Sequence, residues 1–141
     1  MKTAFTDDWK REEEIKKAYH TAKEKGDEAG METARNDIRE LNERIARKGE
    51  AYCRIYRSYR DAMERGNDSI DFSESIWDNE VEGLIEDLRR FGIKTFTFSS
   101  TWSSSVKTAW LFKKNGCTLE GMVEINGSDC EKIPAYLFRA S

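Results

Sequence analysis

The residues best placed to act on another molecule are carboxylates. Eight of them, and no Lys or Arg, lie between Asp68 and Asp87, although the net charge of the chain is only −3. On a helix, 3.6 residues per turn would place Asp78, Glu82 and Glu86 on one outward ridge, with Glu80 and Asp87 beside it. These five carboxylates span about 14 Å of axis, or one charge per ~3 Å, comparable with the ~3.4 Å per phosphate along one DNA strand. The acidic ridge is therefore a candidate contact for a protein whose groove normally holds nucleic acid.

Two other interpretations of the acidic ridge stay open at the level of sequence. A charged helix face is commonly hydrated and has no partner at all. Alternatively, arginines from the preceding helix could dock on the ridge within the same chain, as exposed ion pairs of little net energy.

A basic stretch precedes the acidic one. Between Arg44 and Arg65 the sequence has seven basic and three acidic residues, with tyrosines interleaved among the arginines. Such a pattern can grip a nucleic-acid backbone and stack on bases. However, Glu50, Asp61 and Glu64 each lie four residues from an arginine, which predicts local ion pairs on a helix surface. Direct nucleic-acid binding is thus the less favoured alternative, and its residues would be Arg47, Arg54, Arg57 and Arg60.

The sequence shows little that could support catalysis. His20 is the only histidine, and no metal-ligand spacing, Walker loop or dinucleotide-binding glycine pattern is present. Cys53, Cys117 and Cys130 are widely spaced and are expected to be reduced thiols. The serine-rich segment 99–105 could hold an anion at a helix start, but no glycine opens it, so helix capping is the simpler interpretation. We expect no enzymatic activity, no cofactor and no metal.

Two helices are expected in the first half of the chain. The first begins at Thr6 and ends before Gly26. The second runs from Asp27 to Arg65, with apolar residues at alternating steps of three and four that form a heptad seam. Gly49, next to a break in the seam at Lys48, predicts a bend in this long helix. The two helices should fold back as an antiparallel hairpin.

The second half combines helices with strands. After a linker at 67–73, Ser75 and Asp78 have the spacing of a capping box and open a third helix that ends at Gly92. Strands are expected at Ile93–Ser99, Cys117–Ile125 and Ile133–Phe138, with a fourth helix capped by Ser99, Ser100 or Thr101 between the first two. Pro134 predicts a sheet edge or a bulge.

The fold class that follows is α+β: an N-terminal antiparallel helical hairpin with a long second helix, then a helix and a small three-stranded mixed sheet in the order β-α-β-β. We expect one domain, residues 1–141, with a helical hairpin subregion at 6–66 and an α/β subregion at 74–140. No apolar run approaches the ~20 residues of a membrane span, and the N-terminus lacks the apolar core of a signal peptide. The expected location is the cytoplasm.

The C-terminal third adds a resemblance to known proteins. Residues 91–138, FGIKTFTFSSTWSSSVKTAWLFKKNGCTLEGMVEINGSDCEKIPAYLF, resemble a family of small uncharacterised proteins of Gram-positive bacteria that is spread by conjugative and other mobile elements. The resemblance implies no catalytic residues. Mobile-element proteins of this size include anti-CRISPR inhibitors of Cas9, and the resemblance implies a link to that group.

We therefore expect a protein-binding inhibitor or regulator, most specifically an anti-CRISPR that presents its acidic ridge to Cas9 or its guide-RNA complex. One alternative is a self-associating coiled-coil module in which the heptad seam forms a homodimer. The other is a nucleic-acid-binding protein that uses the basic helix.

Overall fold

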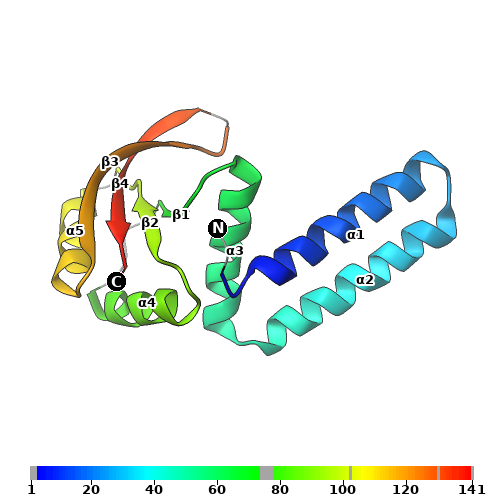
Figure 1. The fold of residues 1–141 in the computed structure, drawn as a ribbon, viewed down its shortest axis with the longest axis horizontal. Coiled ribbons are helices and arrows are strands. Elements are labelled where there is room, and N and C mark those ends of the chain that lie inside the picture. The colour runs from blue at the N-terminus through cyan, green and yellow to red at the C-terminus, as the bar shows by residue number, and fades with distance from the viewer. Residues whose placement is uncertain (1–2, 74–77, 102, 130, 141) are drawn as a thin grey trace. The chain divides into compact units, whose positions relative to one another are not determined.

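The computed structural model describes residues 3–73, 78–101, 103–129 and 131–140. The fold is α+β, as predicted (Figure 1). Its elements are α1 (Thr6–Glu24), α2 (Glu28–Arg47), α3 (Glu50–Arg65), β1 (Ile70–Phe72), α4 (Asp78–Arg90), β2 (Thr95–Phe98), α5 (Ser105–Lys114), β3 (Thr118–Asn126) and β4 (Lys132–Arg139). Two compact units divide the chain, Lys2–Arg54 and Ile55–Ser141, so the division falls inside α3.

The first unit contains the predicted antiparallel hairpin of α1 and α2 (Figure 1). The Asp27 side chain caps α2 by accepting a hydrogen bond of 3.0 Å from the amide of Gly30. Gly26, at φ 67°, makes the left-handed turn between the helices. The hairpin buries apolar residues of both helices, namely Ile15, Ala22, Met31, Ala34, Leu41 and Ile45.

The long second helix of the prediction is two helices. α2 ends at Arg47 and α3 begins at Glu50. Gly49 has φ 101°, a left-handed conformation that glycine adopts without steric cost, so the expected bend is a complete break. The seam continues across the break, since Tyr52, Ile55, Tyr59 and Ala62 of α3 are also buried.

The sheet has four strands, not three, in the order β1-β2-β4-β3. The additional strand, β1, lies inside the segment predicted as a linker, and it pairs in parallel with β2 through Ile70↔Phe96. Its three residues are surrounded by turn-forming residues, which hides the strand in the sequence. The remaining pairs, β2 with β4 and β3 with β4, are antiparallel.

Helix α5 packs on the sheet through one aromatic side chain. The ring centroid of Phe112 lies 4.9 Å from that of Phe96, 5.6 Å from Phe98 and 5.3 Å from Phe138. All four rings are essentially inaccessible to solvent. Helix α4 contributes its own buried side, formed by Val81, Leu84, Ile85 and Leu88.

Pro134 lies on β4, which is an inner strand rather than an edge. However, β2 pairs only with Tyr136–Arg139 of β4, so Pro134 belongs to the part of β4 that pairs with β3 alone, opposite Glu124. The missing amide hydrogen is tolerated there as it would be at an edge. The irregularity in the sheet is on β3 instead, between Leu119 and Gly121.

The fourth helix starts later than predicted. Its N-cap is Ser104, without a side-chain capping bond, so the expected caps at Ser99, Ser100 and Thr101 are wrong. The expected cap Ser75 lies outside the described residues. None of the described helices has the length and apolar composition needed to cross a bilayer.

Candidate functional site

The outward side of α4 carries the exposed part of the predicted acidic ridge. Glu80, Glu82 and Glu86 are exposed, and in the described part of the chain none of them forms an ion pair or a hydrogen bond. Asp78 is the first residue of α4, but its side chain is outside the described set. Three of the five predicted carboxylates are therefore known to face solvent without a compensating cation.

The two arginines of α4 are engaged at its C-terminal end. Arg90 contacts Asp87 at 3.5 Å and lies over the ring of Phe91, 4.5 Å from its centroid. The Nε of Arg89 donates a hydrogen bond of 2.6 Å to the carbonyl of Ala140. Asp87, with 23% of its side chain exposed, is thus partly neutralised, whereas Glu80, Glu82 and Glu86 keep their full negative field.

The buried side of α4 determines how the carboxylates are displayed. At 100° per residue, Glu82 and Glu86 lie one turn apart on one flank of the exposed side, and Glu80 lies on the other. About 9 Å of helix axis separates Glu80 from Glu86. The sequence predicts Glu82 and Glu86 on one ridge with Glu80 beside it, and the buried Val81, Leu84, Ile85 and Leu88 leave a strip with Gly83 between these charges.

Gly83 leaves this strip open. A Cβ atom built on Gly83 would have no neighbour within 4 Å, so the described fold does not require a glycine there. Glycine in a helix interior costs about 1 kcal/mol relative to alanine. Gly83 therefore makes the helix less stable than alanine would, and its lack of a side chain lets another molecule approach the helix backbone closely at this position.

The alternative basic residues do not form one surface on one helix. Arg47 belongs to α2 and contacts Glu43 at 3.9 Å, whereas Arg54, Arg57 and Arg60 belong to α3. Arg57 is exposed, and its predicted pair with Asp61 is not formed among the described residues. Arg60 is half-buried.

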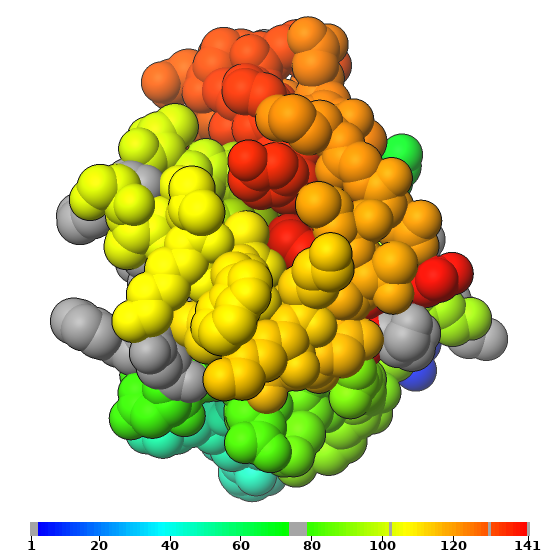
Figure 2. Space-filling model, turned by 90° about the vertical axis from the view of Figure 1, so that its left-hand side faces the viewer, coloured from blue at the N-terminus to red at the C-terminus, as the bar shows by residue number. Residues whose placement is uncertain are grey.

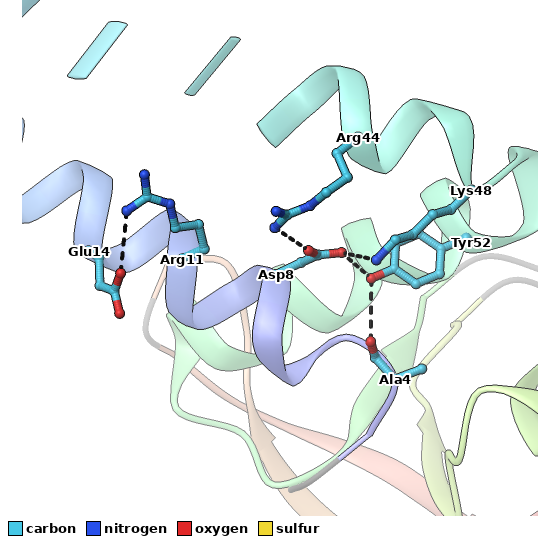
Figure 3. A network of polar contacts seen from close by, with 7 residues as sticks. All are labelled: Ala4, Asp8, Arg11, Glu14, Arg44, Lys48 and Tyr52. Carbon is cyan, nitrogen blue, oxygen red and sulfur yellow. Dashed lines mark hydrogen bonds and ion pairs between the residues drawn. The ribbon is translucent and has the colours of Figure 1, made fainter. Parts of the chain in front are cut away.

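The sequence did not reveal a polar network at the base of the hairpin (Figure 3). Asp8, whose side chain is only 3% exposed, accepts hydrogen bonds from Arg44 at 2.9 Å, Lys48 at 2.8 Å and the Tyr52 hydroxyl at 2.5 Å. Burial alone would raise the pKa of Asp8, but the bonds from Lys48, Tyr52 and Arg44 together lower it. Sequence separations of 36 to 44 residues leave no local signal for these contacts.

A second unexpected cluster joins β1 to β2. Thr97 donates a hydrogen bond of 2.7 Å to one carboxylate oxygen of Asp71, and Ser99 donates one of 2.6 Å to the other. Burial raises the pKa of Asp71, and these two bonds oppose the shift in part. Because both oxygens of Asp71 accept hydrogen bonds from β2 and the residue that follows it, the cluster supports the parallel pairing of β1 with β2, and Ser99 serves the sheet rather than a helix cap.

The candidate catalytic residues remain isolated. His20 is exposed, with the ring of Tyr19 6.0 Å away. Cys117 is buried, and desolvation raises the pKa of its thiol, which disfavours a reactive thiolate. Cys130 is outside the described residues, and in the rest of the chain no three His, Cys, Asp or Glu side chains are grouped as metal ligands.

Comparison with known proteins identifies one family. The model of a Domain of unknown function (DUF7698) matches residues 54–140. This range contains α4, α5 and the whole sheet, and it leaves out the α1–α2 hairpin. No curated protein and no solved structure matches the chain.

Proposed function

Since this chain belongs to the DUF7698 family, whose description states no activity, we propose its function from the surface of α4. The protein acts as a binding inhibitor or regulator of another protein, without chemistry of its own. It presents Glu80, Glu82 and Glu86 to a basic channel that otherwise holds nucleic acid. The observation that carries this proposal is the exposure of these carboxylates without an ion pair, while Arg89 and Arg90 are engaged elsewhere.

The sharper form of the proposal names Cas9, alone or with its guide RNA, as the partner and the cytoplasm as the place of action. Its support is the resemblance of residues 91–138 to proteins of mobile elements, together with the spacing of the carboxylates. A channel lined by Lys and Arg to hold a heteroduplex offers the complementary charge. Association steered by such charges is fast and weakens steeply with salt.

A charge-neutral variant tests the proposal. E80Q/E82Q/E86Q removes three negative charges but keeps the shape and length of the side chains. Exposed ion pairs contribute up to about 1 kcal/mol each, so three lost contacts should weaken the Kd for Cas9–guide complex by ~10-fold to ~100-fold. The salt dependence of binding should fall at the same time.

The matched control is E24Q/E28Q/E40Q. These glutamates are also exposed, form no ion pair among the described residues, and lie in the hairpin unit. The control changes the net charge by the same amount and should leave binding unaltered. Equal loss of affinity in both variants would show that total charge, not the acidic ridge, governs binding. Unchanged DNA cleavage by Cas9 at saturating wild-type protein would refute Cas9 as the target.

The homodimer alternative based on the heptad seam has no exposed surface to use. Met31, Ala34, Leu41 and Ile45 of the seam are already buried in the chain, and only Ile38 is half-buried. For the nucleic-acid alternative, a gel shift that Arg54→Glu and Arg57→Glu abolish, and E80Q/E82Q/E86Q does not, would replace the acidic ridge as the contact.

A further inference from the structure

The outer strand β3 has a neighbouring strand on one side only. In the order β1-β2-β4-β3 it pairs with β4, and the opposite margin of the sheet is the short strand β1. β3 is nine residues long, and residues 118–122 are all exposed. An exposed edge strand of this length presents backbone N–H and C=O groups to which another strand can be added.

The backbone groups on the open edge of β3 belong to Met122 and Glu124. In an antiparallel pair, alternate residues direct both their N–H and C=O groups toward the partner strand, and the residues between them direct these groups away. The amide of Gly127 donates a hydrogen bond of 2.8 Å to the carbonyl of Glu131, so Gly127 faces β4. Every second residue before Gly127 therefore faces β4 as well, and Met122 and Glu124 face away from it.

Two observations support this alternation. Pro134, which has no amide hydrogen, is paired with Glu124, at a position where no bond between the strands is needed. The backbone of Asn126 bonds to the Asn67 side chain instead of β4: its amide donates to Oδ1 at 2.8 Å, and its carbonyl accepts from Nδ2 at 3.0 Å. Asn67 thus takes the place of a further strand at Asn126. In the described part of the chain, nothing bonds to the outward backbone groups of Met122 and Glu124.

The side chains next to this open edge are apolar on the side of the sheet that α5 covers. Leu119 pairs with Phe138, and directly paired residues point to the same side of a sheet. The Phe138 ring lies 5.3 Å from that of Phe112 of α5, so Leu119 is on the α5 side. Met122 pairs with Tyr136, two residues before Phe138, and is on the same side. Figure 2 shows α5 and β3 side by side on one face of the molecule.

These two side chains are unusually accessible. Leu119 is 44% exposed and Met122 is 65% exposed. Since alternate side chains of an added strand point to the α5 side, such a strand would cover both of them. The open backbone and the exposed apolar side chains therefore require the same kind of occupant.

The charges of β3 favour a partner protein over a second copy of the chain. β3 carries Glu120 and Glu124 and no Lys or Arg. Glu120 is paired with Arg139 at 3.2 Å, whereas Glu124 is exposed and forms no ion pair with any described residue. Pairing with the β3 of a second copy would bring the glutamates of both copies onto one seam, and like charges on paired strands are destabilising. The irregular register between Leu119 and Gly121 also limits the regular part of the edge.

We propose that the open edge of β3 binds an extended segment of a partner protein, which adds to the sheet as a further strand. The backbone groups of Met122 and Glu124 bond to the segment. The segment carries an aliphatic residue opposite Met122 and a Lys or Arg opposite Glu124, so in the antiparallel direction it has the pattern basic-x-aliphatic. This inference does not rest on the proposed function, which concerns the carboxylates of α4.

An NMR titration of the full chain with the peptide acetyl-TKTLTLT-amide tests the inference. The backbone amides of Met122 and Glu124 should shift, with a Kd of ~0.1–1 mM, as expected for a short segment that becomes ordered on binding. N-methylation of the first Leu removes the amide that faces Met122 and should weaken binding at least ~10-fold. N-methylation of the Thr before it is the matched control, because that amide faces away from β3 and the Kd should not change.

Two substitutions at Glu124 separate the role of its backbone from that of its charge. Glu124→Pro removes the outward amide at an edge position that tolerates proline, and it should abolish peptide binding. Glu124→Ala keeps the amide and should weaken binding only ~2-fold to ~5-fold. Circular dichroism and Tm of both variants are the control for folding. The N-methylated peptides test the wild-type chain, so they decide the matter even if Glu124→Pro does not fold.

Three results overturn the inference: no peptide binding at ~1 mM, equal affinities of the two N-methylated peptides, or peptide-induced shifts confined to residues outside β3. A wild-type dimer in sedimentation velocity that Glu124→Pro makes monomeric also overturns it, because a second copy then occupies the edge. The inference and the proposed function can fail separately. E80Q/E82Q/E86Q should bind the peptide like the wild type, and Glu124→Pro should leave binding to the basic partner unchanged.

Discussion

Replacement of Asp8 by Asn should destabilise the helical hairpin more than any other single charge-neutral change in it. Asn keeps one acceptor oxygen, but its amide group is a donor placed among the donors of Arg44, Lys48 and Tyr52. Hydrogen bonds to a charged group contribute about 1.5–3 kcal/mol each, and a buried ion pair broken on one side costs about 3–5 kcal/mol. Arg44 and Lys48 are 54% and 40% exposed and regain water, so we expect a loss of ~2–4 kcal/mol.

The loss of stability caused by Asp8→Asn should become smaller as the pH falls. The pKa of Asp8 is lowered in the folded protein, so its stabilising contribution is complete above the ordinary value of 3.8 and disappears as the pH falls below it. Urea unfolding followed by circular dichroism should therefore show a large difference between wild type and Asp8→Asn at neutral pH. The difference should shrink between pH ~4 and pH ~2.

Asp7→Asn is the control for this experiment. Asp7 lies in the same first turn of α1, is exposed, and has no ion pair or hydrogen bond among the described residues. It should change the free energy of unfolding by less than ~0.5 kcal/mol. Hydrogen exchange localises the effect to α1 and α2. An Asp8→Asn variant that matches Asp7→Asn at neutral pH would refute the reasoning, because the network would then contribute nothing.

Three further changes probe the unit that contains the sheet. Gly83→Ala should raise the free energy of unfolding by about 1 kcal/mol in thermal denaturation, since no neighbour opposes the added methyl group; a lower Tm would show that the glycine is structurally required. Phe112→Ala removes the ring between Phe96 and Phe138 and should cost ~3–5 kcal/mol, whereas Trp110→Ala on the same helix should cost less than ~1 kcal/mol; similar costs would contradict the described core. In a chain whose other cysteines are Ser, Cys117 should react with a thiol reagent only as fast as the protein opens, because the thiol is buried and its pKa is raised; rapid labelling of the folded chain would contradict this.

The periodicity of apolar residues predicted the helices and most strands because this pattern is contained in a short stretch of sequence. The heptad seam is found across α2 and α3, the stop at Gly26 separates α1 from α2, and the predicted strand around Thr95–Phe98 is formed as β2. Strand β1 was missed because its pairing is not local: the buried Ile70 pairs with Phe96, 26 residues away, while its sequence neighbours favour turns. A three-residue strand carries too little pattern to compete with Gly, Asn, Asp and Ser.

The candidate site could be predicted only in part. The sequence located the carboxylates of α4 and predicted the helix that carries them. It could not show that Arg89 donates a hydrogen bond to the carbonyl of Ala140, because these residues are 51 positions apart. The same limit applies to the buried Asp8, whose hydrogen-bond partners lie 36 to 44 residues away in the sequence. Which side of a helix is buried depends on its tertiary partner, and the single-sequence pattern could not identify that partner.

The central claim is that the exposed carboxylates of α4 contact a basic surface. Its most direct test is the affinity of the chain for a Cas9–guide complex across a salt series, for wild type, E80Q/E82Q/E86Q and E24Q/E28Q/E40Q. We predict that binding of the α4 variant is weakened ~10-fold or more and has a shallower salt dependence, while the hairpin variant matches the wild type. If the wild type binds and the two variants show the same affinity as the wild type at every salt concentration, the claim is contradicted.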